Sequence, residues 1–121
     1  VVKAAGAKPV EWNFKVECCG AAHSIAHTEI VENLSKQILD DAINHKANVV
    51  VVACPMCHSN LDMRQKNIIK HNPGRMEIPI LYLSQLIGLS MGLDNKSLGL
   101  DLHFIDTAPL IASLNEKEVV V

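Results

Sequence analysis

The stretch ANVVVVACPMCHSN, residues 47–60, joins an unbroken run of valines to a Cys-x-x-Cys pair. A continuous β-branched run is typical of a strand that is buried on both faces, as in a parallel sheet. Pro55 suits the first position of a helix, so we expect a helix to begin directly after Cys54. The stretch therefore predicts a strand that leads into a helix, with Cys54 and Cys57 at the junction.

Before this junction the chain predicts another strand and another helix. Residues 10–17, VEWNFKVE, alternate apolar and polar side chains, which is the pattern of a half-covered strand. Between residues 24 and 45 apolar residues recur every fourth position, which predicts an amphipathic helix. Ser24 or Thr28 is a suitable cap for the start of that helix.

The same alternation continues after the junction. Residues 77–83, EIPILYL, predict a strand, and residues 84–93 predict a short apolar helix capped by Ser84. We then expect an edge strand or extended segment at 100–106 and a helix at 107–114, capped by Asp106 or Thr107. This order predicts an α/β fold, a three-layer Rossmann-like domain in which helices flank a small, mostly parallel sheet.

Length and composition fit one domain spanning residues 1–121. Hydrophobic residues make up 49% of the chain, aromatic residues 3%, and the net charge is -2, which argues against a nucleic-acid surface. Apolar runs fall far short of the roughly 20 residues that span a bilayer. The start, VVKAAGAKP, resembles a last helical turn stopped by Gly6, so we expect an excised fragment of a longer protein with a frayed end at 115–121.

The four cysteines form two pairs, each placed after a predicted strand. Cys18 and Cys19 follow the strand at 10–17, and Cys54 and Cys57 follow the strand at 47–53. Because parallel strands end at the same edge of a sheet, we expect the two pairs to meet there. Each pair also precedes a helix N-terminus, where backbone N–H groups favour thiolates. Four such sulfurs would suit an iron–sulfur cluster or zinc.

Cysteine spacing leaves several interpretations open. A Cys-x-x-Cys pair is equally a zinc-ligand spacing and a redox pair, and free buried thiols are the plainest alternative. A disulfide between the adjacent Cys18 and Cys19 would be strained. Because neighbouring side chains diverge, this pair suits separate iron atoms of a cluster better than one tetrahedral ion. Gly20 either permits a tight turn and a close backbone approach to sulfur, or is an ordinary turn glycine.

Other polar residues have a functional and a plainer interpretation. His58 could donate to a sulfur ligand or supply a proton, although a solvent-facing helix residue is the commoner case. Asn60 and Ser59 could donate to sulfur or simply solvate the first helical turn, and His23 could replace a zinc ligand. The helix at 84–93 is either a core helix or a subunit contact. Surface positions are expected for three further histidines, His45, His71 and His103. They are also expected for a basic stretch that could alternatively bind an anionic substrate: Arg64, Lys66, Lys70 and Arg75.

These motifs together resemble the cysteine-rich CCG domain of the heterodisulfide reductase B subunit and related proteins. ECCGAAHS at 17–24 and ACPMCHSNLDMRQ at 53–65 match its Cys-Cys-Gly and Cys-Pro-x-Cys parts, and IPILYLSQLIGLSMGL at 78–93 is similar to the segment that follows. The resemblance covers about residues 1–93. Related domains occur in iron–sulfur subunits that oxidise lactate, glycolate and glycerol-3-phosphate, and in some succinate or fumarate reductases. The family pattern also has an upstream cysteine, which would fall before Val1.

The resemblance implies a noncubane 4Fe–4S cluster in the full-length protein, with Cys18, Cys19, Cys54 and Cys57 as ligands. It further implies that the chain is the C-terminal CCG domain of an oxidoreductase subunit that reduces a disulfide substrate in two one-electron steps. Electrons would come from partner iron–sulfur or flavin subunits. Such a subunit would be cytoplasmic, or attached to a membrane complex through its partners, and the fragment alone would be inactive, with zinc or no metal bound.

Two other function classes compete with this one. The chain could be a structural zinc-binding or subunit-docking domain without chemistry of its own. It could also be a dithiol–disulfide carrier that uses Cys54 and Cys57. Metal content separates the three classes, because only the first requires iron together with sulfide.

Overall fold

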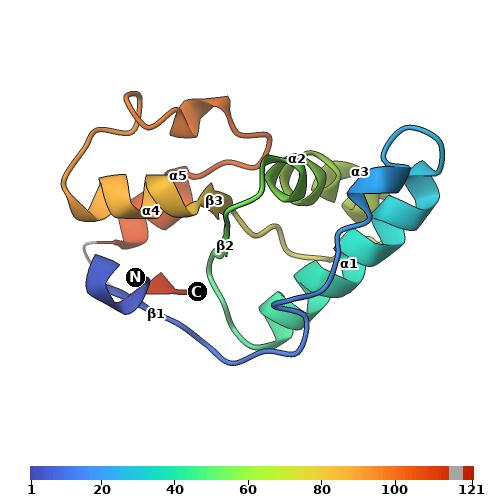
Figure 1. Ribbon diagram of the computed structural model, residues 1–121, viewed down its shortest axis with the longest axis horizontal. Helices are drawn as coiled ribbons and strands as arrows, with labels where there is room; N and C mark the ends of the chain where they lie inside the picture. Colours follow the sequence, from blue (N-terminus) through green and yellow to red (C-terminus); the bar gives the residue numbers. More distant parts are fainter. Residues whose placement is uncertain (115–118) are drawn as a thin grey trace.

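The computed structural model describes residues 1–114 and 119–121. In it, 3₁₀ turns (η), helices and strands follow one another along the chain (Figure 1). The elements are η1 (Lys3–Ala5), β1 (Ala7–Lys8), η2 (Ala21–His23), α1 (Thr28–Asn44), β2 (Val50–Val52), α2 (Pro55–Met63), α3 (Gln65–His71), β3 (Ile80–Tyr82), α4 (Leu83–Ser90), η3 (Leu100–Leu102), α5 (Ala108–Ser113) and β4 (Val119–Val120).

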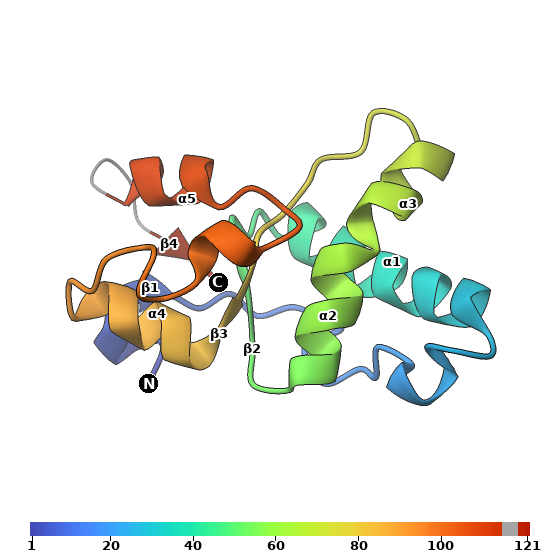
Figure 2. The same ribbon diagram turned by 90° about the horizontal axis from the view of Figure 1, so that it is seen from above.

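At the centre of the fold β2 and β3 pair in parallel, with Val50 opposite Ile80. The two strands lie between α1, α2 and α3 on one side and α4 and α5 on the other (Figures 1 and 2). Side chains along β2 alternate between two hydrophobic cores: Val50 belongs to the core beneath α1 and α2, whereas Val49 and Val51 contact the core beneath α4 and α5. The valine run therefore forms a strand covered on both faces, as the sequence predicts.

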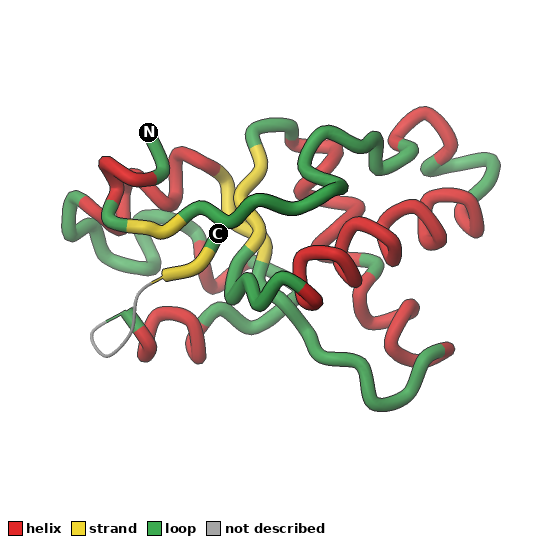
Figure 3. Tube along the Cα trace, turned by 90° about the horizontal axis from the view of Figure 1, so that it is seen from below, coloured by secondary structure: helices red, strands yellow, loops and turns green. Residues whose placement is uncertain are grey.

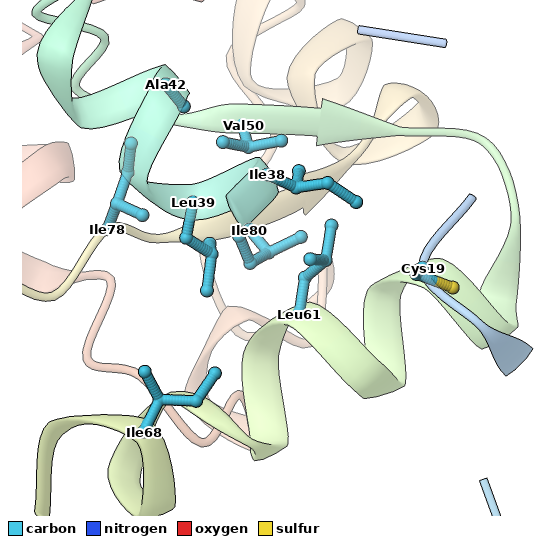
Figure 4. Packing of buried hydrophobic residues seen from close by; sticks show 9 residues of the cluster. All are labelled: Cys19, Ile38, Leu39, Ala42, Val50, Leu61, Ile68, Ile78 and Ile80. Atoms are coloured by element: carbon cyan, nitrogen blue, oxygen red, sulfur yellow. The ribbon is translucent and has the colours of Figure 1, made fainter. Parts of the chain in front are cut away.

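The core beneath α1 and α2 is built from residues of five elements and their flanking segments (Figure 4). The predicted amphipathic helix is confirmed as α1, which buries Val31, Ile38, Leu39 and Ala42. It begins at Thr28, with His27 in the cap position, so neither expected cap is used, and the Ser24 hydroxyl donates to Asn60 Oδ1 instead. The core residues are Cys19, Ile38, Leu39, Ala42, Val50, Leu61, Ile68, Ile78 and Ile80.

The predicted strand at 10–17 is wrong. All eight residues are described, and they form turns and irregular backbone. The alternating pattern arises because Trp12 and Phe14 cover the core, while the backbone N–H groups of Asn13 and Phe14 donate to Asp41 at 2.8 and 3.2 Å. A carboxylate on α1 thus takes the place of a neighbouring strand, and an apolar–polar alternation alone cannot tell the two apart.

Residues before and after the expected strands form a second, smaller parallel pair, β1 with β4 (Figure 3). Ala7 pairs with Val119 and Lys8 with Val120. The turn before β1 ends at Gly6, whose φ of 81° is left-handed, in agreement with the expected stop. The expected frayed end at 115–121 falls partly on residues 115–118, which lie outside the described residues.

The C-terminal half agrees with the sequence except at one element. Residues 100–106 form η3 and a bend instead of an edge strand, because the Asp62 carboxylate binds the N–H groups of Phe104 and Ile105. The helix α5 starts as expected, with the Ala108 N–H donating to Asp106. The helix α4 starts one residue early, where Gln85 rather than Ser84 accepts the Tyr82 N–H, and it buries Leu86 in the core.

The fold is thus a mixed α/β arrangement with helices on both faces of a parallel strand pair. Its described strands form two parallel pairs, β1 with β4 and β2 with β3. Within residues 1–114 and 119–121, every helix is too short or too polar to cross a membrane.

Candidate functional site

Three of the four cysteines meet where β2 leads into α2. Cys54 is the residue before α2, and Cys57 lies in its first turn, as the sequence predicts. Cys19 reaches them from the segment before η2, with its Sγ 3.5 Å from that of Cys57. Figure 4 shows Cys19 beside the first turns of α2, at one end of the core. One member of the first pair, Cys19, thus meets the second pair as expected, while Cys18 does not, and the segment before Cys18 is not the predicted strand.

The adjacent cysteines point to different surroundings. Cys19 is 1% exposed and belongs to the core, whereas Cys18 is exposed and its Sγ accepts the Gly20 N–H at 3.3 Å. Gly20 has a φ of 79°, a left-handed conformation that turns the chain directly after the cysteines. The tight turn is therefore confirmed, and of the two sulfurs that precede it Cys19 points inward and Cys18 outward.

We expect replacement of Gly20 by alanine to cost about 2 kcal/mol of unfolding free energy. The left-handed backbone disfavours any side chain, and an added Cβ would lie 2.8 Å from Leu34 Cδ1. Gly92 is the matched control, because it has the same φ of 79° but open space around a Cβ. Urea unfolding should show Gly92→Ala losing only about 1 kcal/mol. Equal losses would mean that the Leu34 contact contributes nothing.

The two cysteines at the start of α2, Cys54 and Cys57, have opposite electrostatic environments. Backbone N–H groups of Cys57 and Met56, at the helix N-terminus, lower the pKa of Cys54. Burial, followed by contact with Cys19 and Cys54, raises the pKa of Cys57 to about 12. Cys54 thus loses its proton more readily than an ordinary thiol. Cys57 beside it stays protonated at neutral pH and can give up its proton to a cation that binds there.

A cavity of about 270 Å³ adjoins these sulfurs. Cys19, Cys54 and Cys57 line it together with Trp12, Phe14 and apolar residues of β2. A larger cavity of about 620 Å³ lies at the opposite ends of the strands, between residues 46–48 and 76–79, and no cysteine lines it. Sulfur donors with an adjoining apolar space fit a soft metal or an iron–sulfur group, so chemistry favours the smaller cavity over the larger one.

Several polar residues in and after α2 are buried rather than exposed to solvent. Asn60 is 2% exposed and donates from Nδ2 to Cys19 Sγ at 3.5 Å, so it does more than solvate a helical turn. Arg64 is 8% exposed, and its Nε donates to Asn60 Oδ1. The expected surface position is therefore wrong for Arg64, and also for Arg75, which pairs with Asp40 at 2.6 Å. Lys66 and Lys70 are exposed as expected.

Some of the histidines expected at the surface are exposed and others are not. His45 and His71 are exposed, as is His23, the candidate zinc substitute. His58 is buried, donates from Nε2 to Ile80 O at 3.1 Å and stacks on Tyr82 with ring centres 4.2 Å apart. Burial is also the main cause of the lowered pKa of His58. Its ring therefore faces β3, and His58 is not a solvent-facing helix residue.

Sequence reasoning missed the cluster of His58, Asp62 and His103, whose ligand atoms lie within 4.8 Å of one another. Its signal is the spacing of residues 58, 61 and 62, which place His58 and Asp62 on the same buried face of α2 as Leu61. Hydrogen bonding argues against a metal here. Gln85 donates to His103 Nε2, so the proton is on Nδ1, and that nitrogen has no lone pair to offer.

Comparisons with known proteins agree with the cysteine pattern. The family profile of the CCG cysteine-rich domain matches residues 1–62. The chain is 35% identical over 111 residues to the 8-methylmenaquinol:fumarate reductase membrane anchor subunit of Wolinella succinogenes. It is 31% identical over 120 residues to the B subunit of the ferredoxin/F(420)H(2)-dependent CoB-CoM heterodisulfide reductase of Methanosarcina acetivorans. A protein of Archaeoglobus profundus that is named for its likeness to the heterodisulfide reductase B subunit is 31% identical over 96 residues.

These alignments take in most of this chain but a minor part of each relative. They cover 91%, 96% and 76% of the chain, and 39%, 39% and 31% of the respective relatives. The profile match includes both cysteine pairs and the β2–α2 junction that brings Cys19, Cys54 and Cys57 together. The chain therefore belongs to the CCG cysteine-rich domain family, and its relatives are subunits of oxidoreductases.

Proposed function

We propose that the chain is the cluster-binding domain of an oxidoreductase similar to the heterodisulfide reductase B subunit, with Cys18, Cys19, Cys54 and Cys57 as ligands of a noncubane 4Fe–4S cluster. The observation that carries the proposal is the meeting of three of these sulfurs beside a cavity, in a chain of the CCG family. The bound cluster would supply one-electron transfer. The finer assignment of a three-layer Rossmann-like fold is a proposal too, supported by helices on both faces of β2 and β3.

The residues around the sulfurs suit such a role. Cys54 directly precedes α2, where the N–H groups of Met56 and Cys57 and the helix dipole stabilise negative charge on its sulfur, and Cys57 lies in the first turn beside it. Trp12 and Phe14 line the cavity and pack against the core that contains Cys19, which reduces access of water to that sulfur. Cys54 is exposed and so faces whatever approaches the site. The chain thus protects one sulfur and presents another.

For the whole subunit we propose reduction of a disulfide substrate in two one-electron steps, with electrons from partner iron–sulfur or flavin subunits. The names of the relatives support this, since one is a heterodisulfide reductase subunit and another a membrane anchor subunit. We accordingly place the subunit in the cytoplasm, attached to a membrane complex through its partners.

A second candidate is a structural zinc domain, and one distance favours it. Two thiolates bound to one tetrahedral zinc, each about 2.3 Å from the metal, lie about 3.8 Å apart. The 3.5 Å between the sulfurs of Cys19 and Cys57 is close to that separation. The same proximity would suit a disulfide carrier, although with Cys19 rather than Cys54 as the partner of Cys57.

Metal analysis of the full-length protein, purified without oxygen, tests these functions. We expect iron and acid-labile sulfide in equal amounts, about four of each per CCG cluster site. One zinc per chain without iron would overturn the cluster assignment and leave the zinc domain. A metal-free protein that undergoes a reversible two-electron oxidation, lost on replacing Cys57 alone, would identify a disulfide carrier.

Metal uptake should depend strongly on pH. Since the raised pKa keeps Cys57 protonated at neutral pH, binding must displace its proton. We expect the apparent affinity of the metal-free protein for zinc to rise about tenfold per pH unit for each proton released, between about pH 6 and pH 8. Chelator-competition titrations at several pH values measure this slope. An affinity independent of pH would show that the thiols are already deprotonated.

A further inference from the structure

The side-chain amide of Asn60 has only one orientation compatible with its neighbours. Oδ1 accepts two hydrogen bonds, from Ser24 Oγ and from Arg64 Nε, each 3.2 Å long. A flipped amide would place its NH₂ against these two donors. Nδ2 must therefore face the other way, where Cys19 Sγ lies 3.5 Å from it.

The Arg64 side chain fixes this orientation of the Asn60 amide. It lies four residues after Asn60, is 8% exposed, and its Nη2 donates to the Ser24 backbone carbonyl at 3.1 Å. The guanidinium therefore fixes both Asn60 and the segment that follows the adjacent cysteines. Its positive charge next to Oδ1 polarises the amide and strengthens the donation from Nδ2, because hydrogen bonds in series reinforce one another in a low dielectric.

We propose that Asn60 is a positioning residue whose Nδ2–H donates to the Cys19 sulfur and raises the reduction potential of an iron–sulfur group bound through that sulfur. This rests on the proposed function and adds a residue outside the cysteine motifs. Reduction adds negative charge that spreads onto the ligand sulfurs, and a donor stabilises that charge. Since Cys19 is 1% exposed, water has little access to provide such a donor in place of Asn60.

A purely structural role for Asn60 makes a different prediction. Its bond with Ser24 connects α2 to the segment before α1, and that bond needs only Oδ1. Loss of the connection would reduce stability and iron content but would not change the electron density on sulfur. The reduction potential and the ligand spectrum therefore distinguish the two roles.

The test compares Asn60→Leu, Asn60→Asp and Arg64→Lys in the full-length subunit, with Asn67→Leu as the matched control. Asn67 is exposed and donates to Glu32, away from the cysteines. Redox titration followed by electron paramagnetic resonance gives the potential. We expect Asn60→Leu to lower the equilibrium constant for reduction of the cluster about tenfold, which corresponds to a reduction potential about 59 mV lower for one electron. Asn60→Asp should lower it further because it adds a carboxylate, and Arg64→Lys should lower it less.

An unchanged potential in Asn60→Leu with full iron content would overturn the inference. So would a loss of iron and stability with no shift in the clusters that remain. A wild-type protein without iron would instead refute the proposed function. The inference is then tested with cobalt(II) bound to the cysteines of the same full-length proteins. Removing the donor makes the Cys19 sulfur more electron-rich, so the sulfur-to-cobalt charge-transfer band of Asn60→Leu should move to lower energy, and an unmoved band would refute the role of Asn60.

Discussion

Replacing Cys57 with serine in the full-length subunit is expected to remove nearly all iron from the site of this domain. Cys57 is the central sulfur of the group: its Sγ is 3.5 Å from that of Cys19, and it also interacts with Cys54. Serine keeps the size of the side chain but offers a hard oxygen where a soft ligand is needed. We expect the affinity for iron to fall by more than the roughly 10–100-fold that loss of a supporting hydrogen bond costs.

Iron and sulfide analysis measures this loss, and Ser59→Ala is the control. Ser59 is exposed and lies on α2 two residues after Cys57, so its replacement tests for a general disturbance of the helix. Cys18→Ser gives a further comparison, because the Cys18 sulfur binds the Gly20 N–H and not another cysteine. Full retention of iron in Cys57→Ser would refute the ligand assignment. An equal loss in Cys18→Ser would place Cys18 among the ligands of the loaded protein.

Replacing Asp62 with asparagine is expected to lower the unfolding free energy by about 3 kcal/mol. The Asp62 carboxylate is 2% exposed and accepts the N–H groups of Phe104 at 2.8 Å and Ile105 at 3.1 Å. Asparagine has the same shape but must turn an NH₂ group toward one of these donors. One charged hydrogen bond is lost and one buried donor is left without an acceptor, and each of these effects is destabilising.

Urea unfolding of the metal-free protein measures the effect of Asp62→Asn, and the slope of unfolding free energy against urea concentration should stay the same in the two proteins. Asp101→Asn is the control, since Asp101 is exposed on η3 and its replacement should change stability by less than about 0.5 kcal/mol. A change of that size at Asp62 would mean that the segment around Phe104 is held by its apolar contacts alone.

The sequence predicts the parts of this fold that depend on apolar spacing. The valine run, the α1 stripe and the start of α2 at Pro55 all have one plausible structure each, and the structure has them. The segment at 10–17 fails because two aromatic residues on an irregular chain produce the same alternation as a strand. Its backbone partner, Asp41, is a distant polar residue that no local pattern identifies.

In the candidate site, the sequence predicts where the cysteines lie but not the polar residues that support them. The positions of Cys54 and Cys57 follow from the strand–helix junction, and their meeting with Cys19 agrees with the expectation. The supporting residues Asn60, Arg64 and His58 were expected mainly at the surface, because charged and amide side chains usually lie there. They are buried because each finds specific partners from segments distant in sequence, such as Ser24 and Ile80, and single-sequence patterns carry no information about such pairs.

The alternation of side chains along β2 has a consequence for how the molecule comes apart. Val50 belongs to one core while Val49 and Val51 contact the other, so detaching either group of helices exposes a strand on which the other group also depends. The two halves are then expected to unfold as one cooperative unit, with slow amide exchange shared across β2 and β3. Leu110, in the half without cysteines, thereby helps to set how long Cys19 stays shielded from solvent and oxidants.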